Sequence, residues 1–134
     1  MEVTKTSYGF KKEVEIDYDV AIVKITEELK KEGFGILTEI DVKKTLKAKI
    51  NEEFTKYIIL GACNPNLAIQ ALREEMDIGL LLPCNIIVYE NTIRGTVIIA
   101  TINPSSMVEV TGREDLNSFA KQVGQKLTSA LERV

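Results

Sequence analysis

Residues 86–102 read IIVYENTIRGTVIIATI and contain two apolar segments, 86–89 and 96–102, on either side of a polar turn. β-Branched residues of this kind favour strands, and a turn between two such segments favours a hairpin. We therefore predict two adjacent antiparallel strands near the centre of a sheet. Isoleucine and valine occupy both odd and even positions of these segments. We therefore expect both faces of the two strands to be covered by other parts of the protein or by a second copy.

Other predicted elements flank this hairpin. An alternating apolar pattern or a short apolar run predicts strands at 8–16, 34–40 and 57–60. Asp41 is a good helix N-cap, and the three apolar residues that follow it at helical spacing are expected to face inward: Val42, Leu46 and Ile50. Further helices are predicted after residue 17, ending at Gly33, and after Asn64, with the chain returning through 78–82.

The C-terminal part is predicted to be one long helix. Thr111 and Glu114 have the spacing of a capping box, and apolar residues then recur at steps of three and four up to Val134. The order of elements is neither a strict strand–helix alternation nor all strand. It indicates an α+β protein with a single, mostly antiparallel sheet, helices packed on one face and a long C-terminal helix.

Composition restricts the chemistry. The 134 residues, of which 45% are hydrophobic and 28% charged, suit a single domain over 1–134. There is no histidine, which excludes imidazole-based nucleophilic catalysis and histidine-ligated zinc, and we expect no metal site. The net charge of −3 argues against nucleic acid as a partner. The sequence shows neither a signal peptide nor a membrane-spanning stretch, so we expect a cytoplasmic protein with free thiols.

Two short units of similar chemistry form the main candidate site. Cys63 and Asn64 follow the strand at 57–60, and Cys84 and Asn85 precede the strand at 86–89. The helix start after Cys63 should favour a thiolate or a bound anion there. Structural roles stay open, because free cysteines are often buried and asparagines often cap helices or occupy turns. If the chain returns through 78–82 along the helix after Asn64, as we expect, both cysteines lie at the same end of the sheet. A full crossover helix would instead make the strands at 57–62 and 86–89 parallel and leave the cysteines at opposite ends.

A second candidate site consists of two carboxylates. Glu39 and Asp41 lie two apart and share a face of the strand that ends near residue 40. They could act as acid and base or hold a cation. The alternative is structural, with Asp41 capping the next helix and Glu39 in solvent.

Three blocks resemble a known family. They read GFGILTEIDV at 33–42, ILGACNP at 59–65 and IGLLLPCN at 78–85, and together they resemble the bacterial and archaeal family called domain of unknown function 302. The resemblance covers about residues 5–110. It implies a fold like that of the TATA-box-binding protein, without implying DNA binding, and it implies no activity, ligand or cofactor.

Three functions therefore remain open. The first is a small-ligand binding or carrier module with Cys63 and Cys84 at its site. The second is a thiol enzyme or redox protein with Cys63 as nucleophile and Cys84 as resolving partner. The third is an interaction module in which these residues are structural. Because one sheet face is left without helices, we also expect a homodimer.

Overall fold

The computed structural model describes residues 2–134, which form a six-stranded sheet in the order β1-β2-β6-β5-β4-β3. All neighbouring strands in it are antiparallel, as predicted. The strands are β1 (Thr4–Lys5), β2 (Gly9–Val14), β3 (Gly35–Asp41), β4 (Tyr57–Cys63), β5 (Cys84–Asn91) and β6 (Thr96–Ile102). The two-residue strand β1 was not predicted.

The predicted hairpin of β5 and β6 lies inside the sheet. Val88 pairs with Ile99, and both side chains are fully buried on one face. The next pair along, Ile87 and Ala100, points to the other face and is only partly buried. The apolar residues at both parities thus supply two different surfaces, of which one is the core.

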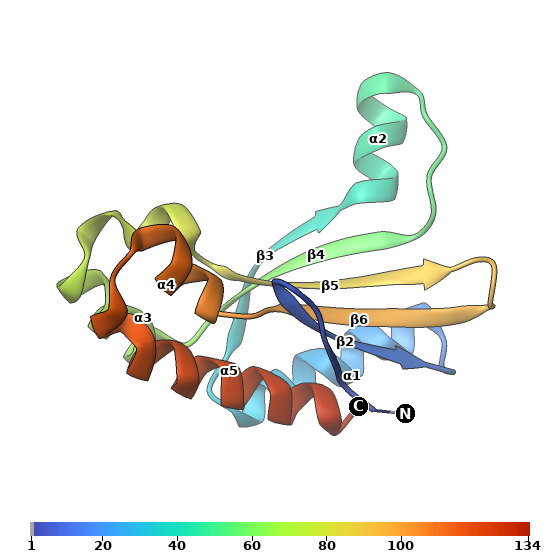
Figure 1. Cartoon of the computed structure of the whole chain (residues 1–134). Coiled ribbons are helices and arrows are strands. Elements are labelled where there is room, and N and C mark those ends of the chain that lie inside the picture. The colour runs from blue at the N-terminus through green and yellow to red at the C-terminus, as the bar shows by residue number, and fades with distance from the viewer. Residues whose placement is uncertain (1) are drawn as a thin grey trace.

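Helices cover one of these two faces. Figure 1 shows α1 and α5 against the same face of the sheet, α3 and α4 near one end of it, and α2 standing away on the opposite side. The helices are α1 (Tyr18–Lys31), α2 (Val42–Ile50), α3 (Pro65–Glu74), α4 (Ser105–Thr111) and α5 (Asn117–Glu132). The core joins α1 and α5 to the sheet through fully buried side chains that include Ile25, Leu29, Leu127 and Leu131. The predicted α+β architecture is confirmed.

The predicted capping box is wrong. Thr111 is the last residue of α4, and its hydroxyl donates to the carbonyl oxygen of Met107 at 2.6 Å. Gly112 then ends α4 with a φ of 68°, a conformation that glycine adopts without strain. A short 3₁₀ helix, Glu114–Leu116, leads into α5. The long C-terminal helix therefore begins at Asn117, after a separate short helix that the apolar periodicity did not indicate.

The inward orientation predicted for the helix after Asp41 is also wrong. The Asp41 cap itself is present, because the backbone N–H of Lys44 donates to its carboxylate at 3.0 Å. Yet none of the α2 residues, all within the described part, is buried, and Ile50 is 62% exposed. Because α2 connects the adjacent antiparallel strands β3 and β4, it continues beyond their ends instead of crossing a face of the sheet.

The segment between β4 and β5 returns the chain as expected. It consists of α3 and a 3₁₀ helix, Met76–Leu81, where an extended stretch was predicted. Since β4 and β5 are antiparallel, the end of β4 and the start of β5 lie at the same end of the sheet. Within residues 2–134, no helix is both long and apolar enough to cross a membrane.

Candidate functional site

Asn64 organises the point where β4 ends and α3 begins. Its side-chain Oδ1 accepts a hydrogen bond from the backbone N–H of Leu67 at 3.3 Å, which is the N-cap predicted from the sequence. Its Nδ2 donates to the carbonyl oxygen of Glu32 at 3.2 Å. Gly33 has a φ of +85°, and a Cβ there would lie 2.8 Å from Nδ2 of Asn64. The end of α1 and the start of α3 are thus joined through one amide.

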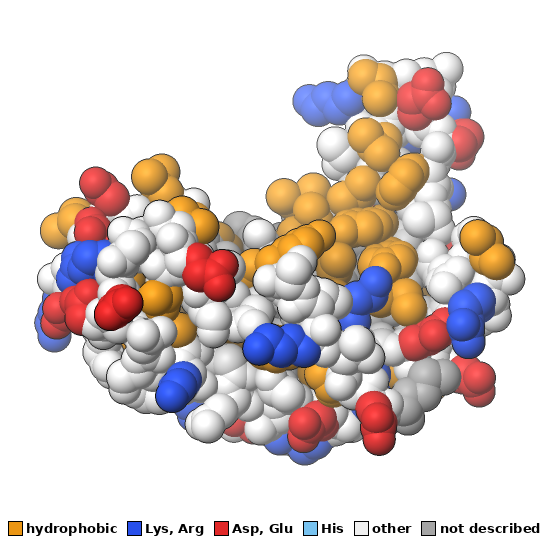
Figure 2. All heavy atoms as spheres, in the orientation of Figure 1, with side chains coloured by type: hydrophobic (Ala, Val, Ile, Leu, Met, Phe, Trp, Pro, Cys, Tyr) orange, Lys and Arg blue, Asp and Glu red, His pale blue; other side chains and the backbone are white. Residues whose placement is uncertain are grey.

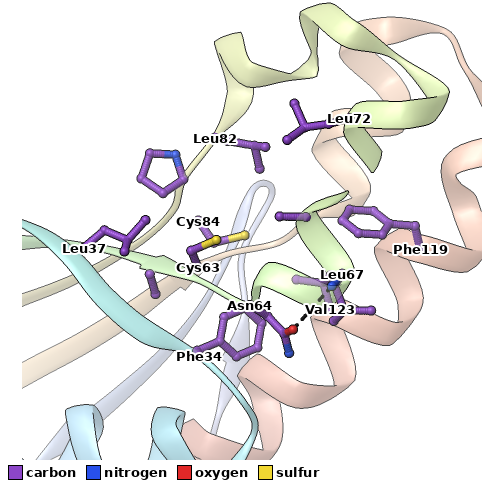
Figure 3. A pocket seen from close by; sticks show the side chains of 13 residues that line it. Phe34, Leu37, Cys63, Asn64, Leu67, Leu72, Leu82, Cys84, Phe119 and Val123 are labelled. Atoms are coloured by element: carbon purple, nitrogen blue, oxygen red, sulfur yellow. Dashed lines mark hydrogen bonds between the residues drawn. The ribbon is translucent and has the colours of Figure 1, made fainter. Parts of the chain in front are cut away.

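The two cysteines lie at one cavity, at the end of the sheet where β4 stops and β5 starts. Ala62 pairs with Cys84, and Cys63 is the next residue of β4. Both cysteines line a cavity of about 270 Å³, and Figure 3 shows their sulfur atoms within the ring of lining side chains. The expected meeting of the two units is therefore correct for the cysteines.

Most of the cavity wall is hydrocarbon. The aliphatic and aromatic side chains that face it in Figure 3 come from β3, α3, α5 and the segments next to them: Phe34, Leu37, Leu67, Leu72, Leu82, Phe119 and Val123. The Asn64 amide is already hydrogen bonded on both sides. The two thiols are therefore the side-chain groups of the wall that could offer a bound molecule a soft, polarisable or nucleophilic contact.

The two thiols differ in their surroundings. Cys84 is only 6% exposed. Burial, and to a smaller extent the neighbouring Cys63, raises the pKa of the Cys84 thiol to about 11, so this group is a neutral thiol at pH 7. Cys63 is partly exposed, and both cysteines are free. Cys63 is therefore the thiol that a molecule entering the cavity can reach more easily.

Asn85, the remaining residue of the two cysteine–asparagine units, lies elsewhere. Successive residues of β5 point to opposite faces, so Cys84 faces the helix-covered side while Asn85 is exposed on the other side. Asn85 lines a separate groove on that side together with Ile87 and Tyr89. The structure brings Cys63, Asn64 and Cys84 together and leaves Asn85 out.

The carboxylate pair is also separate from this cavity. Asp41 lies at the end of β3 next to α2, where its carboxylate caps that helix. Glu39 is exposed on β3. Neither residue is among those that line the cysteine cavity. Within residues 2–134, no group of three or more cysteine, histidine or acidic side chains is arranged to hold a metal ion.

Several cavity residues had no signal in the sequence. Leu37 lies at an irregularity in the pairing of β3 with β4, between Ile36 and Thr38, and contributes to the cavity wall. Phe119 and Val123 belong to the apolar stripe of α5, which was expected simply to pack on the sheet. A periodic pattern identifies the buried stripe of a helix, but it does not tell which of its members border a hollow.

The fold and the site together define an α+β protein with one antiparallel sheet, helices on one of its faces and an apolar, thiol-lined cavity at one end of the sheet. The chain belongs to the family domain of unknown function 302, whose model matches residues 10–134. A crystal structure of an uncharacterized conserved protein of this family from Bacillus stearothermophilus is similar, with 30% sequence identity and a TM-score of 0.88 over 96% of this chain and 98% of that one. No curated protein matches the chain.

Proposed function

We propose that the protein binds a small, largely apolar molecule in the cavity that Cys63 and Cys84 help to line. The observation that carries this proposal is a cavity of about 270 Å³ with a wall that is almost entirely hydrocarbon. An apolar cavity of about 150 Å³ already binds benzene in another protein. The volume therefore suits a substituted single aromatic ring or a short acyl chain, with the thiols next to it.

Toluene is a suitable probe for this proposal. Toluene should raise the melting temperature of the native protein and shift the methyl resonances of Leu67, Leu72 and Val123, which all line the cavity. Ala68→Leu places extra carbon atoms in the cavity and should abolish both effects. Gln70→Leu adds the same side chain to an exposed position of α3 and should leave both effects in place.

The two readouts separate binding in the cavity from binding elsewhere. Resonance shifts confined to the cavity and lost in Ala68→Leu support the proposal. A melting temperature that toluene leaves unchanged in the native protein would reject it. An equal response of the native protein and Ala68→Leu would also reject it, because the toluene would then occupy another surface.

A thiol-dependent activity is the second candidate. It is favoured by the presence of both cysteines at one cavity. In this function, a peroxide would accept two electrons and two protons from the Cys63 and Cys84 thiols and leave a disulfide between their sulfur atoms. Mass spectrometry before and after peroxide treatment tests it: loss of two hydrogen atoms that dithiothreitol restores supports a redox role. Two sulfonic acids, or no change, would leave the cavity as a binding site only. The third candidate function is an interaction module. In such a module the two cysteines would serve only to pack the structure.

Three broader properties accompany the proposal. We take 1–134 as one domain, because one cluster of buried residues joins the sheet to α1 and α5. Two free thiols suit a reducing compartment such as the cytoplasm. A homodimer is proposed because the sheet face opposite α1 and α5 is rich in apolar side chains, and a second copy would cover them. The likeness to the TATA-box-binding protein stays an expectation about the fold.

A further inference from the structure

The face of the sheet turned away from α1 and α5 is apolar; we call it the open face. Strand register places six apolar side chains on it, of which Ile98 is already buried and five are partly exposed: Tyr57, Ile59, Ile87, Tyr89 and Ala100. Figure 2 shows hydrophobic side chains gathered over this part of the sheet, beneath α2. A groove of about 410 Å³ runs along the open face and is lined in part by Tyr57, Ile87 and Ala100. This surface has the character of an interface core.

A projecting arm borders the open face. The arm comprises residues 42–56, that is, α2 and the segment that leads to β4. Figure 1 shows it standing clear of the rest of the protein. Ile50 and Phe54 of the arm are 62% and 45% exposed, although both are large apolar residues. Phe54 packs in part on Tyr57 of its own chain, with ring centroids 6.3 Å apart, so the uncovered apolar surface of the arm is that of Ile50 and the exposed part of Phe54.

The arm is held in shape by its own contacts. Lys43 Nζ donates to the carbonyl oxygen of Phe54 at 3.0 Å, and Lys47 forms an ion pair with Glu53 at 2.8 Å. Asn51 ends α2 in the left-handed conformation with a φ of 55°. Because the helix and the returning segment are tied together, docking of the arm would cost little conformational entropy.

Charge favours a second copy of the chain as the occupant of the open face. The arm contains five lysines and two glutamates, whereas the rest of the chain contains 12 lysines and arginines against 18 carboxylates. The arm is thus basic and the remainder acidic, so an arm from one copy is attracted to the body of another. A two-fold arrangement forms each such contact twice and covers the arm and the open face at the same time.

We propose that the arm of each protomer lies in the open-face groove of a second copy of this chain, in a reciprocal exchange of arms. This inference rests on the proposed homodimer and specifies its contact surfaces. Ile50 and the exposed part of Phe54 would supply the apolar surface that enters the groove, and Ile87 and Tyr89 would receive it. The lysines of α2 would stay outside the groove, whose lining within residues 2–134 contains Lys11 and no carboxylate, and would be attracted by the net negative charge of the rest of the partner.

Light scattering after size exclusion tests the surfaces one at a time. The native protein should have twice the chain mass of 15.0 kDa. Ile50→Glu in the arm and Ile87→Glu in the groove should each weaken dimerisation at least about 100-fold, as expected for core positions of an interface. Leu80→Glu is the matched control, because Leu80 is 88% exposed and lies outside both surfaces, and it should leave the dimer intact.

Circular dichroism checks that each variant is folded. If Ile87→Glu does not fold, Tyr8→Glu replaces it, since Tyr8 lines the groove and is 70% exposed.

Mixing the two variants distinguishes reciprocal exchange from other dimers. In a heterodimer of Ile50→Glu with Ile87→Glu, the intact arm of one chain meets the intact groove of the other, so one of the two contacts is restored. The mixture should dimerise at a concentration at which each variant alone is a monomer. A monomeric native protein would overturn both the homodimer and the arm exchange. A dimer that persists in Ile50→Glu, or a mixture that stays monomeric, would overturn the arm exchange alone.

Discussion

The side chain of Asn64 donates to the carbonyl oxygen of Glu32 at 3.2 Å, although the two residues are 32 positions apart. The same amide accepts the N–H of Leu67 at the start of α3. Asn64 therefore stabilises the wall of the cysteine cavity by joining two helices, and this role explains the residue without any contact to a ligand. Its neighbour Cys63 gains a defined position as a result.

Replacement of Asn64 should measure this structural role. Asn64→Ala removes the N-cap and leaves the Glu32 carbonyl without its donor, so we expect a loss of about 2 kcal/mol in the free energy of unfolding. Asn64→Asp keeps an acceptor for the cap and should lose less. Urea denaturation at a fixed protein concentration provides the measurement. Asn66→Ala, at an exposed position of the same helix turn, should change little, and an equal loss in both alanine variants would contradict this role.

Lys12 makes a second long-range connection, at the end of α5. This lysine is only 6% exposed, and its Nζ donates to the carbonyl oxygens of Leu131 and Glu132, in the last turn of α5, at 3.4 and 2.9 Å, and to an oxygen of Val134 just beyond the helix at 2.6 Å. The last carbonyls of a helix have no partners within the helix, and the negative end of the helix dipole favours a cation there. One buried ammonium group thus fixes the C-terminus of α5 against β2.

Lys12→Met should destabilise the protein while keeping much of the side-chain volume. We expect a loss of about 2 to 3 kcal/mol, because hydrogen bonds to a charged group are lost and the carbonyls stay unpaired. Hydrogen exchange of the last turn of α5 should accelerate in the same variant. Lys24→Met, at an exposed position of α1, serves as the control. If the two variants unfold at the same urea concentration, the lysine does not anchor the helix.

The parts of the fold that depend on neighbouring residues could be predicted from the sequence. The hairpin of β5 and β6 follows from two β-branched segments and a turn between them. The Asn64 cap and the Asp41 cap follow from residue type and from the position before a helical pattern. Each of these features is decided by contacts within a few residues.

Features that depend on the whole sheet could not be predicted. The apolar spacing of Val42, Leu46 and Ile50 indicates an amphipathic helix, but it does not tell whether the apolar side meets this chain's core or another surface. Cys84 and Asn85 are adjacent in sequence and yet face opposite sides of the sheet, because β5 continues through both of them. The cysteine cavity therefore lacks Asn85. It includes Leu37 and Phe119 instead, two apolar residues that the sequence does not mark as part of a site.

The expected likeness to the TATA-box-binding protein leads to a prediction about DNA. The groove on the open face is lined mainly by aromatic, aliphatic and uncharged polar residues, and among the residues that the structure describes Lys11 is the one cation in its lining. Phosphate contacts need several lysines or arginines, and the net charge of the chain is −3. We therefore expect no specific binding to duplex DNA in a mobility-shift assay at physiological salt, with a basic DNA-binding protein as positive control. A shifted band that strengthens at low salt and depends on sequence would contradict this expectation.

Alkaline pH should reveal the buried state of Cys84. The ordinary pKa of the thiol is 9.0, and burial raises the pKa of Cys84 to about 11 in the folded protein. Between these values the unfolded chain loses the proton while the folded chain keeps it. The folded state should therefore lose about 2 to 3 kcal/mol of stability as the pH rises from about 9 to about 11. This contribution should be absent from Cys84→Ala.

The comparison of the two proteins isolates the thiol from other groups. Burial also raises the pKa of Tyr18 and Tyr57, but both tyrosines are present in the native protein and in Cys84→Ala. Denaturant titrations at several pH values between 8 and 11.5 provide the measurement. Parallel stability curves for the two proteins would show that Cys84 is accessible to water in the folded state.

The relative reactivity of the two thiols is the last prediction. Cys63 is partly exposed at the cavity, whereas Cys84 is buried. With a pKa of about 11, Cys84 has a thiolate fraction at pH 8 about 100-fold below that of an ordinary thiol, and only the thiolate attacks iodoacetamide. Because Cys63 is the more exposed of the two cysteines and the thiolate fraction of Cys84 is this small, Cys84→Ser, which retains Cys63, should react faster than Cys63→Ser, which retains Cys84. Saturating toluene should slow the reaction of Cys63, because an occupied cavity blocks access to the sulfur atom. If Cys63 reacts only after unfolding, it is a core residue. A thiol-dependent function would then be rejected, while binding of an apolar molecule in the cavity would still be open to the toluene experiment.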